Sequence, residues 1–410
     1  MPTDLTFDLQ LPHLPQALDA GGVAQLFAGR WPAGGGGAEV RSCRLQDVKY
    51  QPGQRCVATY ALQVERAGVL EQTIGVVEVT PAGLAHRLYD DDPRLPHLRE
   101  ASDPTRMAPR FAAVLGGAAD VAVTPVRYRP GVRCVFRYEV GAPGGRQVLF
   151  GKLLGEGASE LAATLAALHR ASEDSPALPR VLPALALWPE IGMIVQQEVA
   201  GRAELNDLAF DPQVDAPTRE RWLRDAGARL AGLHGLKGVP APARTFEDDM
   251  DELREYLAPM AAADPSLAAR YRAALEALET RARGRAASAP VASHGAFRTD
   301  QFLIEGERLV LIDLDGFCHA DPARDLGNFL AYLRWKAIRR PQQEEAIARA
   351  GELFLEGYAA AGGRSDPAWL NIYRAASLLK IAGRRYRSLT VKEWPLVPLL
   401  VDNAERVSQS

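Results

Sequence analysis

Residues 294–330 read HGAFRTDQFLIEGERLVLIDLDGFCHADPARDLGNFL, and this stretch decides the fold. Two short apolar runs, 302–304 and 309–312, flank a Glu-Gly-Glu turn, so they predict a β-hairpin. Asp313 and Asp315 follow the second run at the end of a buried strand, where carboxylates are costly unless a positive group meets them. The stretch therefore predicts a place that holds a metal ion and a phosphate.

The segment after the hairpin predicts the start of a helix. Asp321 and Asp325 suit a first helical turn, because negative charge there interacts favourably with the helix dipole. We expect both carboxylates to be structural and to stabilise the loop and the helix start.

At these residues the chain resembles the aminoglycoside phosphotransferase and choline-kinase-like family, whose members are relatives of protein kinases. The catalytic loop of that family reads H-G-D-x-x-x-x-N, and an I-D-[WF] strand end and a D-P-x-x-D-L helix start follow it. Here the three blocks are HGAFRTDQ at 294–301, IDL at 312–314 and DPARDL at 321–326. The resemblance implies a two-lobed, protein-kinase-like α+β fold.

Two positions depart from the family pattern. The catalytic Asp of the family falls on Ala296, which cannot accept a proton, and its metal-binding Asn falls on Gln301. Gln still offers a carbonyl oxygen to Mg²⁺, one methylene further out. The resemblance therefore implies ATP and Mg²⁺ as cofactors, with Gln301 and Asp313 as metal ligands. Asp315 is either a further ligand or a turn residue.

The candidate catalytic residues are His294, Arg298 and Asp300. In such loops a residue like His294 is more often a hydrogen-bonding scaffold than a proton carrier. Arg298 stands where family members carry a basic residue, and it would touch the transferred phosphate. Loss of the general base costs on the order of 10²–10⁴ in rate, unless Asp300 or Asp315 takes over its role.

Composition excludes several other classes of protein. The chain has 410 residues, 47% of them hydrophobic and 24% charged, which is ordinary for a soluble globular protein of two or three domains. A net charge of −3 points to neither a nucleic acid nor an anionic membrane as partner. Four widely spread cysteines suit a reducing cytoplasm. We read no signal peptide and no apolar run of the ~20 residues that a membrane span needs. The oligomeric state is left open.

An internal repeat occupies the N-terminal part of the chain. Residues 48–60 (VKYQPGQRCVATY) recur 78 positions later as 126–138 (VRYRPGVRCVFRY), with eight of thirteen positions identical. Pro-Gly between alternating apolar runs is typical of a tight turn. Each copy continues into a further strand, at 72–79 and 147–154, so each predicts a three-stranded antiparallel meander. We expect residues 84–122, between the copies, to be helix or loop.

The second copy resembles the small lobe of a kinase. Lys152 stands alone in an apolar strand, where kinase-like folds place the lysine that meets the nucleotide phosphates. Glu160, in the first turn of a helix predicted over 158–169, is its candidate ion-pair partner. Gly131 would lie in the turn over the phosphates, and Glu198 and Val199 would hydrogen-bond the adenine through their backbone.

The first copy lacks such a lysine and carries Val76-Val77-Glu78 there, so we interpret it as a structural duplicate. The predicted domains are a β-meander cap over 1–95, a kinase-like small lobe over 96–197 and a helical large lobe over 198–410. Helical periodicity predicts large-lobe helices at 221–234, 246–257, 266–283, 342–361, 368–389 and 397–407.

One late helix carries a basic set whose role has two interpretations. Its members are Lys380, Arg384, Arg385 and Arg387. They form either a solvated face or a face toward an anionic substrate.

The leading functional prediction is an ATP- and Mg²⁺-dependent phosphotransferase that acts on a hydroxyl of a small molecule. One alternative is a pseudokinase, which binds nucleotide or acts as a partner module without transfer, and another is adenylyl transfer with the nucleotide reversed. Ala296 favours the alternatives. Lys152, Glu160, Gln301 and Asp313 favour every hypothesis in which nucleotide still binds.

Overall fold

The computed structural model describes residues 8–29, 38–66, 68–117, 120–142, 144–199, 203–286 and 288–409. The chain divides into two compact units. Unit 1 comprises Met1–Ala162, Ala184–Glu198 and Arg387–Leu389, and unit 2 comprises Ala163–Pro183, Val199–Tyr386 and Thr390–Ser410. Unit 1 holds both copies of the repeat in antiparallel sheets, and unit 2 is mainly helical, so the predicted α+β class is confirmed. The predicted boundary near residue 95 lies inside unit 1 and stays a prediction.

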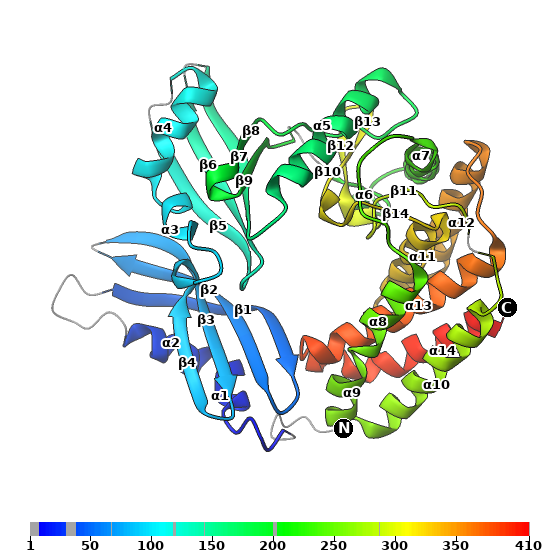
Figure 1. Ribbon diagram of the computed structural model, residues 1–410, viewed down its shortest axis with the longest axis horizontal. Coiled ribbons are helices and arrows are strands. Elements are labelled where there is room, and N and C mark those ends of the chain that lie inside the picture. Colours follow the sequence, from blue (N-terminus) through cyan, green and yellow to red (C-terminus); the bar gives the residue numbers. More distant parts are fainter. Residues whose placement is uncertain are drawn as a thin grey trace. The chain divides into compact units, whose positions relative to one another are not determined.

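The first sheet of unit 1 has the strand order β1-β2-β3-β4. Its strands are β1 (Ala38–Gln51), β2 (Arg55–Arg66), β3 (Val69–Thr80) and β4 (Gly83–Leu88). The expectation of helix or loop from residue 84 was wrong at its start, because 83–88 pairs with β3 as a fourth strand. Helices α1 (Leu14–Leu18) and α2 (Ala20–Ala28) precede the sheet, and α2 lies against it (Figure 1).

The second sheet has the order β5-β6-β7-β9-β8. Its strands are β5 (Val121–Arg129), β6 (Arg133–Ala142), β7 (Gly145–Leu154), β8 (Ala186–Trp188) and β9 (Met193–Gln197). Strands β5-β6-β7 repeat the antiparallel order of β1-β2-β3, which confirms the predicted pair of meanders. Val57 lies opposite Glu78 and its counterpart Val135 lies opposite Lys152. Glu78 therefore occupies the register position of Lys152.

The repeat is longer than the strands alone. Residues 8–19 (DLQLPHLPQALD) match residues 92–103 (DPRLPHLREASD) at seven of twelve positions, 84 residues apart. The second match covers α3 (Leu98–Ala101) and leads into α4 (Pro104–Leu115), as the first covers α1 and leads into α2. Phe111 of α4 packs on Tyr138, with 4.9 Å between ring centroids. Each copy is therefore a helical segment followed by a meander.

An aspartate fixes the Pro-Gly turn in both copies. Asp8 Oδ2 accepts hydrogen bonds from the Tyr50 hydroxyl and from the Gly53 backbone N–H, both at 2.8 Å. Asp92 Oδ2 accepts the equivalent bonds from Tyr128 at 2.5 Å and from the N–H at residue 131 at 2.6 Å. A carboxylate that accepts two such bonds in a largely buried place restrains the turn strongly. We name these contacts the aspartate clamps.

The two cysteines of the repeat are buried and free, as expected of small apolar side chains. Burial raises the pKa of the Cys56 thiol to about 12 and that of Cys134 further. Neither thiol is therefore reactive at neutral pH.

Unit 2 is built from helices. They are α6 (Leu205–Leu208), α7 (Ala216–Gly235), α8 (Phe246–Arg254), α9 (Leu257–Ala263), α10 (Pro265–Ala282), α11 (Pro322–Arg339), α12 (Glu344–Ala360), α13 (Pro367–Arg387) and α14 (Val397–Gln409), while α5 (Ala158–Asp174) begins in unit 1. Every predicted large-lobe helix is present, but the helix predicted over 246–257 is divided between α8 and α9. In the described part of the chain no helix combines the length and apolarity needed to cross a bilayer.

Small residues let α7 and α12 approach closely. A Cβ on Gly227 would lie 2.0 Å from the backbone oxygen of Phe354, and a Cβ on Gly357 would lie 2.0 Å from that of Arg224. A larger residue at either glycine would force the helices apart.

Two small sheets frame the stretch that decides the fold. The predicted hairpin is confirmed as β12 (Phe302–Glu305) paired with β13 (Arg308–Leu311), and β10 (Ala203–Glu204) adds a third strand. A pairing that the sequence did not predict joins β11 (Val291–Ser293) to β14 (Cys318–Ala320). The loop 294–301 thus leaves β11 and enters β12, and the segment 312–317 links β13 to β14.

Candidate functional site

Gly295 is the tightest point of the loop 294–301. Its φ of +85° is in the left-handed region, and a Cβ there would lie 1.9 Å from the backbone oxygen of Gly316. Only glycine combines that φ with so close an approach. The loop therefore touches the segment that follows Asp313.

His294 joins the loop to the end of β13. Its ring is fully buried, and Nε2 lies 3.0 Å from the backbone oxygen of Ile312. The N–H of Ala296 donates to His294 Nδ1 at 3.3 Å. Because Nδ1 accepts, Nε2 carries the proton and donates to the carbonyl, so both ring nitrogens are used. These contacts support a scaffold role, and the catalytic role of His294 stays a prediction.

Asp325, at the start of α11, holds the backbone of the loop. Its carboxylate accepts from the N–H of His294 at 2.7 Å and from the N–H of Gly295 at 3.0 Å. Burial alone raises the pKa of Asp325, but the hydrogen bond with His234, together with smaller effects of the positive charge around it, outweighs burial, so the pKa of Asp325 lies below the ordinary value. An ionised, buried carboxylate therefore fixes the first two residues of the loop.

One face of α11 runs along the rest of the loop. Arg324 Nη1 donates to the backbone oxygen of Gly295 at 2.7 Å, and Asn328 Nδ2 donates to that of Phe297 at 2.9 Å. Arg324 is itself held by Asp249 of α8, through Nε at 2.6 Å and Nη2 at 3.0 Å. Two loop carbonyls are thus fixed by side chains from the first turns of α11.

The next two turns of α11 meet the following loop residues. The guanidinium of Arg298 lies 4.7 Å from the ring centroid of Tyr332. Lys336 Nζ donates at 2.6 Å to Asn206 Oδ1, which also accepts from Thr299 Oγ1 at 2.9 Å. Residues four apart share one side of a helix, so Asn328, Tyr332 and Lys336 follow the loop in order.

Gln301 is the predicted metal ligand with the clearest structural signal. Its side chain is 2% exposed, and neither amide atom has a hydrogen-bond partner. A buried polar group without a partner costs about 1–3 kcal/mol. The N–H of Ile312 donates to the backbone oxygen of Gln301 at 3.0 Å, which places the residue beside the strand end that Asp313 leaves. The free amide fits a hard oxygen ligand.

Asp313 has an unusual backbone. Its φ of 60° and ψ of 48° lie in the left-handed region, which non-glycine residues seldom adopt. Strain of this kind concentrates at ligand-binding and catalytic sites. Asp315 follows in a short 3-10 helix, Leu314–Gly316.

The described residues contain no cluster of three or more His, Cys, Asp or Glu that could hold a metal ion. Mg²⁺ usually takes one or two carboxylates and completes its shell with water and phosphate oxygens. Gln301 and Asp313 therefore fit an ion that is delivered with a phosphate better than an ion caged by protein alone.

Arg298 and Asp300 form an ion pair next to Ala296. Arg298 Nε lies 3.1 Å from Asp300 Oδ1, and the Asp300 side chain is 45% exposed. Ala296 is half-buried and offers no acceptor. The loop therefore carries one carboxylate, that of Asp300, which solvent reaches.

The candidate nucleotide contacts belong to unit 1, except Val199, which is the first residue of the segment Val199–Tyr386 of unit 2. Lys152 lies on β7, opposite residues of β6 and β9, and Glu160 is in the first turn of α5. Gly131 has a φ of +69°, and the aspartate clamp uses its N–H. The N–H of Glu198 donates to a β7 carbonyl at 3.1 Å. Sequence reasoning missed the clamp, although the LPHL motif shared by 11–14 and 95–98 could have revealed it.

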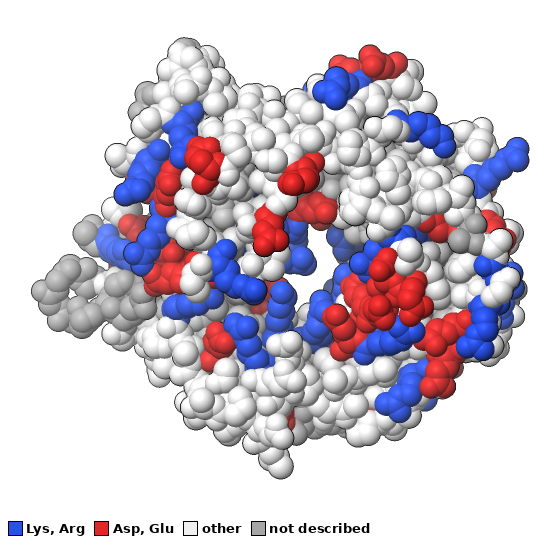
Figure 2. Space-filling model, viewed as in Figure 1, with Lys and Arg blue, Asp and Glu red and all other residues white. Residues whose placement is uncertain are grey.

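Lys380 and Arg384 do not form a solvated face. Both pair with Glu252 of α8, through Lys380 Nζ at 2.6 Å and Arg384 Nη2 at 3.4 Å. Burial raises the pKa of Glu252, but these cations outweigh it and lower the pKa to about 2. Figure 2 shows acidic side chains gathered over α8 with basic side chains around them. The sequence did not predict this network.

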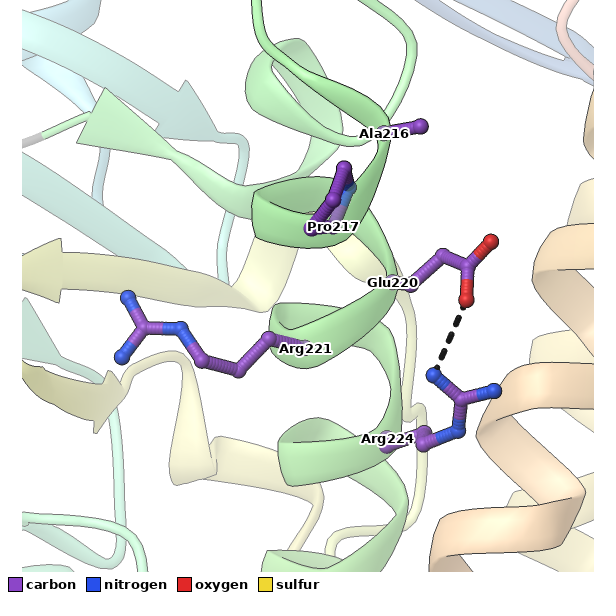
Figure 3. Close-up of a pocket in the computed structure, with 5 residues that line it drawn as sticks. All are labelled: Ala216, Pro217, Glu220, Arg221 and Arg224. Atoms are coloured by element: carbon purple, nitrogen blue, oxygen red, sulfur yellow. Dashed lines mark hydrogen bonds and ion pairs between the residues drawn. The ribbon is translucent and has the colours of Figure 1, made fainter.

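A pocket of about 540 Å³ adjoins the first turns of α7 (Figure 3). Its lining residues are Ala216, Pro217, Glu220, Arg221 and Arg224. Glu220 and Arg224 point toward each other and pair at 3.0 Å, while Arg221 points away from them. No predicted site residue lines this pocket.

Comparison with known proteins gives a family and a fold. The sequence profile of the phosphotransferase enzyme family matches residues 137–364, more than half of the chain. A proposed aminoglycoside phosphotransferase from Ralstonia eutropha superposes with a TM-score of 0.51 at 14% identity, over 74% of this chain and 98% of that one. Amicoumacin kinase, in complex with AMP-PNP, Ca²⁺ and Ami, superposes with a TM-score of 0.50 at 13% identity, over 76% and 95%. No curated protein sequence matches the chain. At these identities the solved structures show a shared fold.

Proposed function

The chain belongs to the phosphotransferase enzyme family, and on that premise we propose that it transfers a phosphoryl group from ATP, with Mg²⁺, to a hydroxyl of a small molecule. The observation that carries the proposal is the buried, unpartnered amide of Gln301 beside Asp313. A buried amide without a hydrogen-bond partner destabilises the free protein. Such an amide is expected where a bound ligand supplies the missing partner.

In this proposal each candidate residue has one task. Gln301 and Asp313 hold the ion, with Asp315 as a further ligand, and the ion neutralises charge on the phosphates. Lys152 meets the phosphates and Glu160 orients it. Arg298 stabilises charge on the transferred group.

Two further proposed contacts involve the adenine ring and the Pro-Gly turn of the second repeat copy. Glu198 and Val199 hold the adenine through backbone groups. We propose that the turn at Gly131 lies over the phosphates, with its N–H donated to Asp92 in the aspartate clamp.

The missing general base limits the rate more than it limits binding. Phosphoryl transfer depends mainly on positioning and charge neutralisation, with little covalent work for the protein. Asp300 is accessible and stands four residues after Ala296, so we propose that it accepts the proton of the acceptor hydroxyl.

A second candidate function is nucleotide binding without transfer. It is favoured by Ala296, because the position offers a methyl group where the family has its proton acceptor. The metal and phosphate contacts would be the same in both functions, so only a transfer assay separates them.

The metal assignment is tested with Gln301→Leu. The substitution removes an unpartnered amide, so the free protein should keep or gain thermal stability. The extra rise in melting temperature that Mg²⁺-ATP gives over ATP with EDTA should disappear. Asn328→Leu is the matched control, because it removes an amide that is hydrogen-bonded to the loop at 2.9 Å and should destabilise the free protein. A wild type with equal shifts in Mg²⁺ and EDTA would contradict the proposal.

The transfer step is tested with Ala296→Asp. If the protein is a phosphotransferase with a weakened base, the variant should raise ATP-dependent phosphorylation of an acceptor, by about 10²-fold or more. If it only binds nucleotide, the new carboxylate would repel the phosphates, and ATP affinity should fall without gain in turnover. Undetectable transfer in both proteins, with weaker ATP binding in the variant, would refute transfer.

A further inference from the structure

Tyr332 of α11 is approached by cations from two other elements. The guanidinium of Arg298, in the loop, lies over its ring at 4.7 Å from the centroid. Arg384 of α13 donates from Nη1 to the Tyr332 hydroxyl at 3.3 Å. Two guanidinium groups therefore converge on one phenol beside the loop.

Lys336 adds a third cation one helical turn further along the same face. Its ammonium donates to the Asn206 amide at 2.6 Å and lies 3.9 Å from the ring centroid of Phe210. In the part of the chain that the structure describes, no carboxylate forms an ion pair with it. Burial, together with Arg340, lowers the pKa of Lys336 to about 8. The charges of Asp207 and Asp300 act on Lys336 without forming an ion pair with it, and burial outweighs them. A half-buried ammonium without a contacting carboxylate is costly, and a bound anion would lower that cost.

The nearby carboxylates leave this positive charge incompletely balanced. Asp300 is nearly half-exposed, and pairs of that kind contribute little. Glu252 lies 3.4 Å from Arg384, but it also pairs with Lys380 at 2.6 Å and with Arg244 at 3.1 Å. A single carboxylate charge is therefore divided among three cations.

We propose that Arg298, Arg384 and Lys336 form an anion-binding subsite around Tyr332, and that the hydroxyl compound phosphorylated by this protein carries a carboxylate or phosphate group that binds there. The subsite adjoins the place of transfer, because Arg298 is two residues from Ala296 in the loop. This inference rests on the proposed phosphotransferase function and names the chemical class of its acceptor. Guanidinium groups, which can donate two parallel hydrogen bonds, and ammonium groups both bind carboxylate and phosphate oxygens well.

The phenol of Tyr332 reports the positive potential of this subsite. Burial raises its pKa, but Arg384, Arg298 and Arg385 outweigh burial, so the pKa lies below its ordinary value. An anion bound among these cations would cancel part of their potential and raise the pKa of Tyr332. The change is specific to the subsite, because phosphate bound elsewhere would leave this phenol unaffected.

The experiment is a tyrosinate absorbance titration without nucleotide. The signal of Tyr332 is taken as wild type minus Tyr332→Phe, with and without inorganic phosphate at up to about 10 mM, ten times a millimolar dissociation constant. Phosphate should raise the pKa of Tyr332 in the wild type. In Arg384→Gln the apparent affinity for phosphate should fall about tenfold or more, which is the loss of one charge-assisted hydrogen bond. Because the pKa of Lys336 is about 8, Lys336→Gln is compared with the wild type by calorimetric titration of phosphate at pH 7, where the ammonium is charged and the same loss of affinity is expected.

Arg349→Gln is the matched control, because Arg349 is an exposed arginine of α12 that pairs with Glu352 and Glu356. It should leave the phosphate effect unchanged. No effect in the wild type, or equal affinity in both test variants, would overturn the subsite. If only Lys336→Gln fails to fold, the result for Arg384→Gln decides. If only Arg384→Gln fails to fold, the result for Lys336→Gln decides. If phosphate raises the pKa of Tyr332 but the protein transfers no phosphoryl group from ATP, the proposed function is refuted and the anion-binding subsite is supported.

Discussion

Gly295→Ala should destabilise unit 2 much more than an ordinary glycine substitution at positive φ. An alanine Cβ at this position would lie 1.9 Å from the Gly316 carbonyl oxygen, so one of the two backbone segments must move by more than 1 Å. That movement breaks the bond from Arg324 to the Gly295 carbonyl, now 2.7 Å long. Left-handed strain costs about 1–2 kcal/mol, and loss of a hydrogen bond to a charged group costs about 1.5–3 kcal/mol. The expected loss is therefore about 2.5–5 kcal/mol.

Gly306→Ala is the matched control within the same unit. Gly306 has a φ of +59° in the hairpin turn, but no atom lies within 4 Å of its Cβ position. Only the strain of about 1–2 kcal/mol should remain. With about 2–4 °C lost per kcal/mol in a domain of this size, the control should melt a few degrees lower and Gly295→Ala about 10 °C lower. Scanning calorimetry measures both, and equal losses in the two variants would refute the close approach of loop and hairpin exit.

Two further predictions concern charged groups. Because the folded pKa of Glu252 is about 2, below the unfolded value, its ionisation stabilises the fold above about pH 4.3 and the stabilisation is lost as pH falls toward 2. Glu252→Gln should therefore lower the melting temperature at pH 7 and have progressively less effect as the pH falls toward 2, and a difference that is independent of pH would contradict the ion network. In the aspartate clamps, Asp92→Asn and Asp8→Asn should each cost about 1–3 kcal/mol in urea unfolding, while a loss in only one copy would show that the clamps are not equivalent.

The hairpin, the helix start at 321–326 and both meanders follow from local sequence signals. A Glu-Gly-Glu turn and a Pro-Gly turn each specify chain reversal within a few residues, so a short window contains all the information. The helical half of the repeat was harder to see, because its copies are 84 residues apart while the strands are 78 apart. Because the two offsets differ, a comparison of the sequence with itself at one offset finds only half of the repeat.

The parts of the site that the sequence did not predict depend on contacts between distant segments. Glu252 and Lys380 are 128 positions apart, and nothing in either helix alone specifies the pairing. Strands β11 and β14 have three residues each, too few for an alternating pattern. The left-handed backbone of Asp313 is equally invisible in the sequence, because it is imposed by the surrounding fold.

The way in which α11 holds the loop has an evolutionary consequence. Every fixing contact described for the loop uses a backbone group or a side chain other than that of Ala296, whose N–H alone is engaged. Aspartate and alanine codons can differ by one base, so a lineage can lose or recover the proton acceptor there in a single mutation without disturbing the architecture. Selection on catalysis and selection on folding therefore act on different residues of the same short segment.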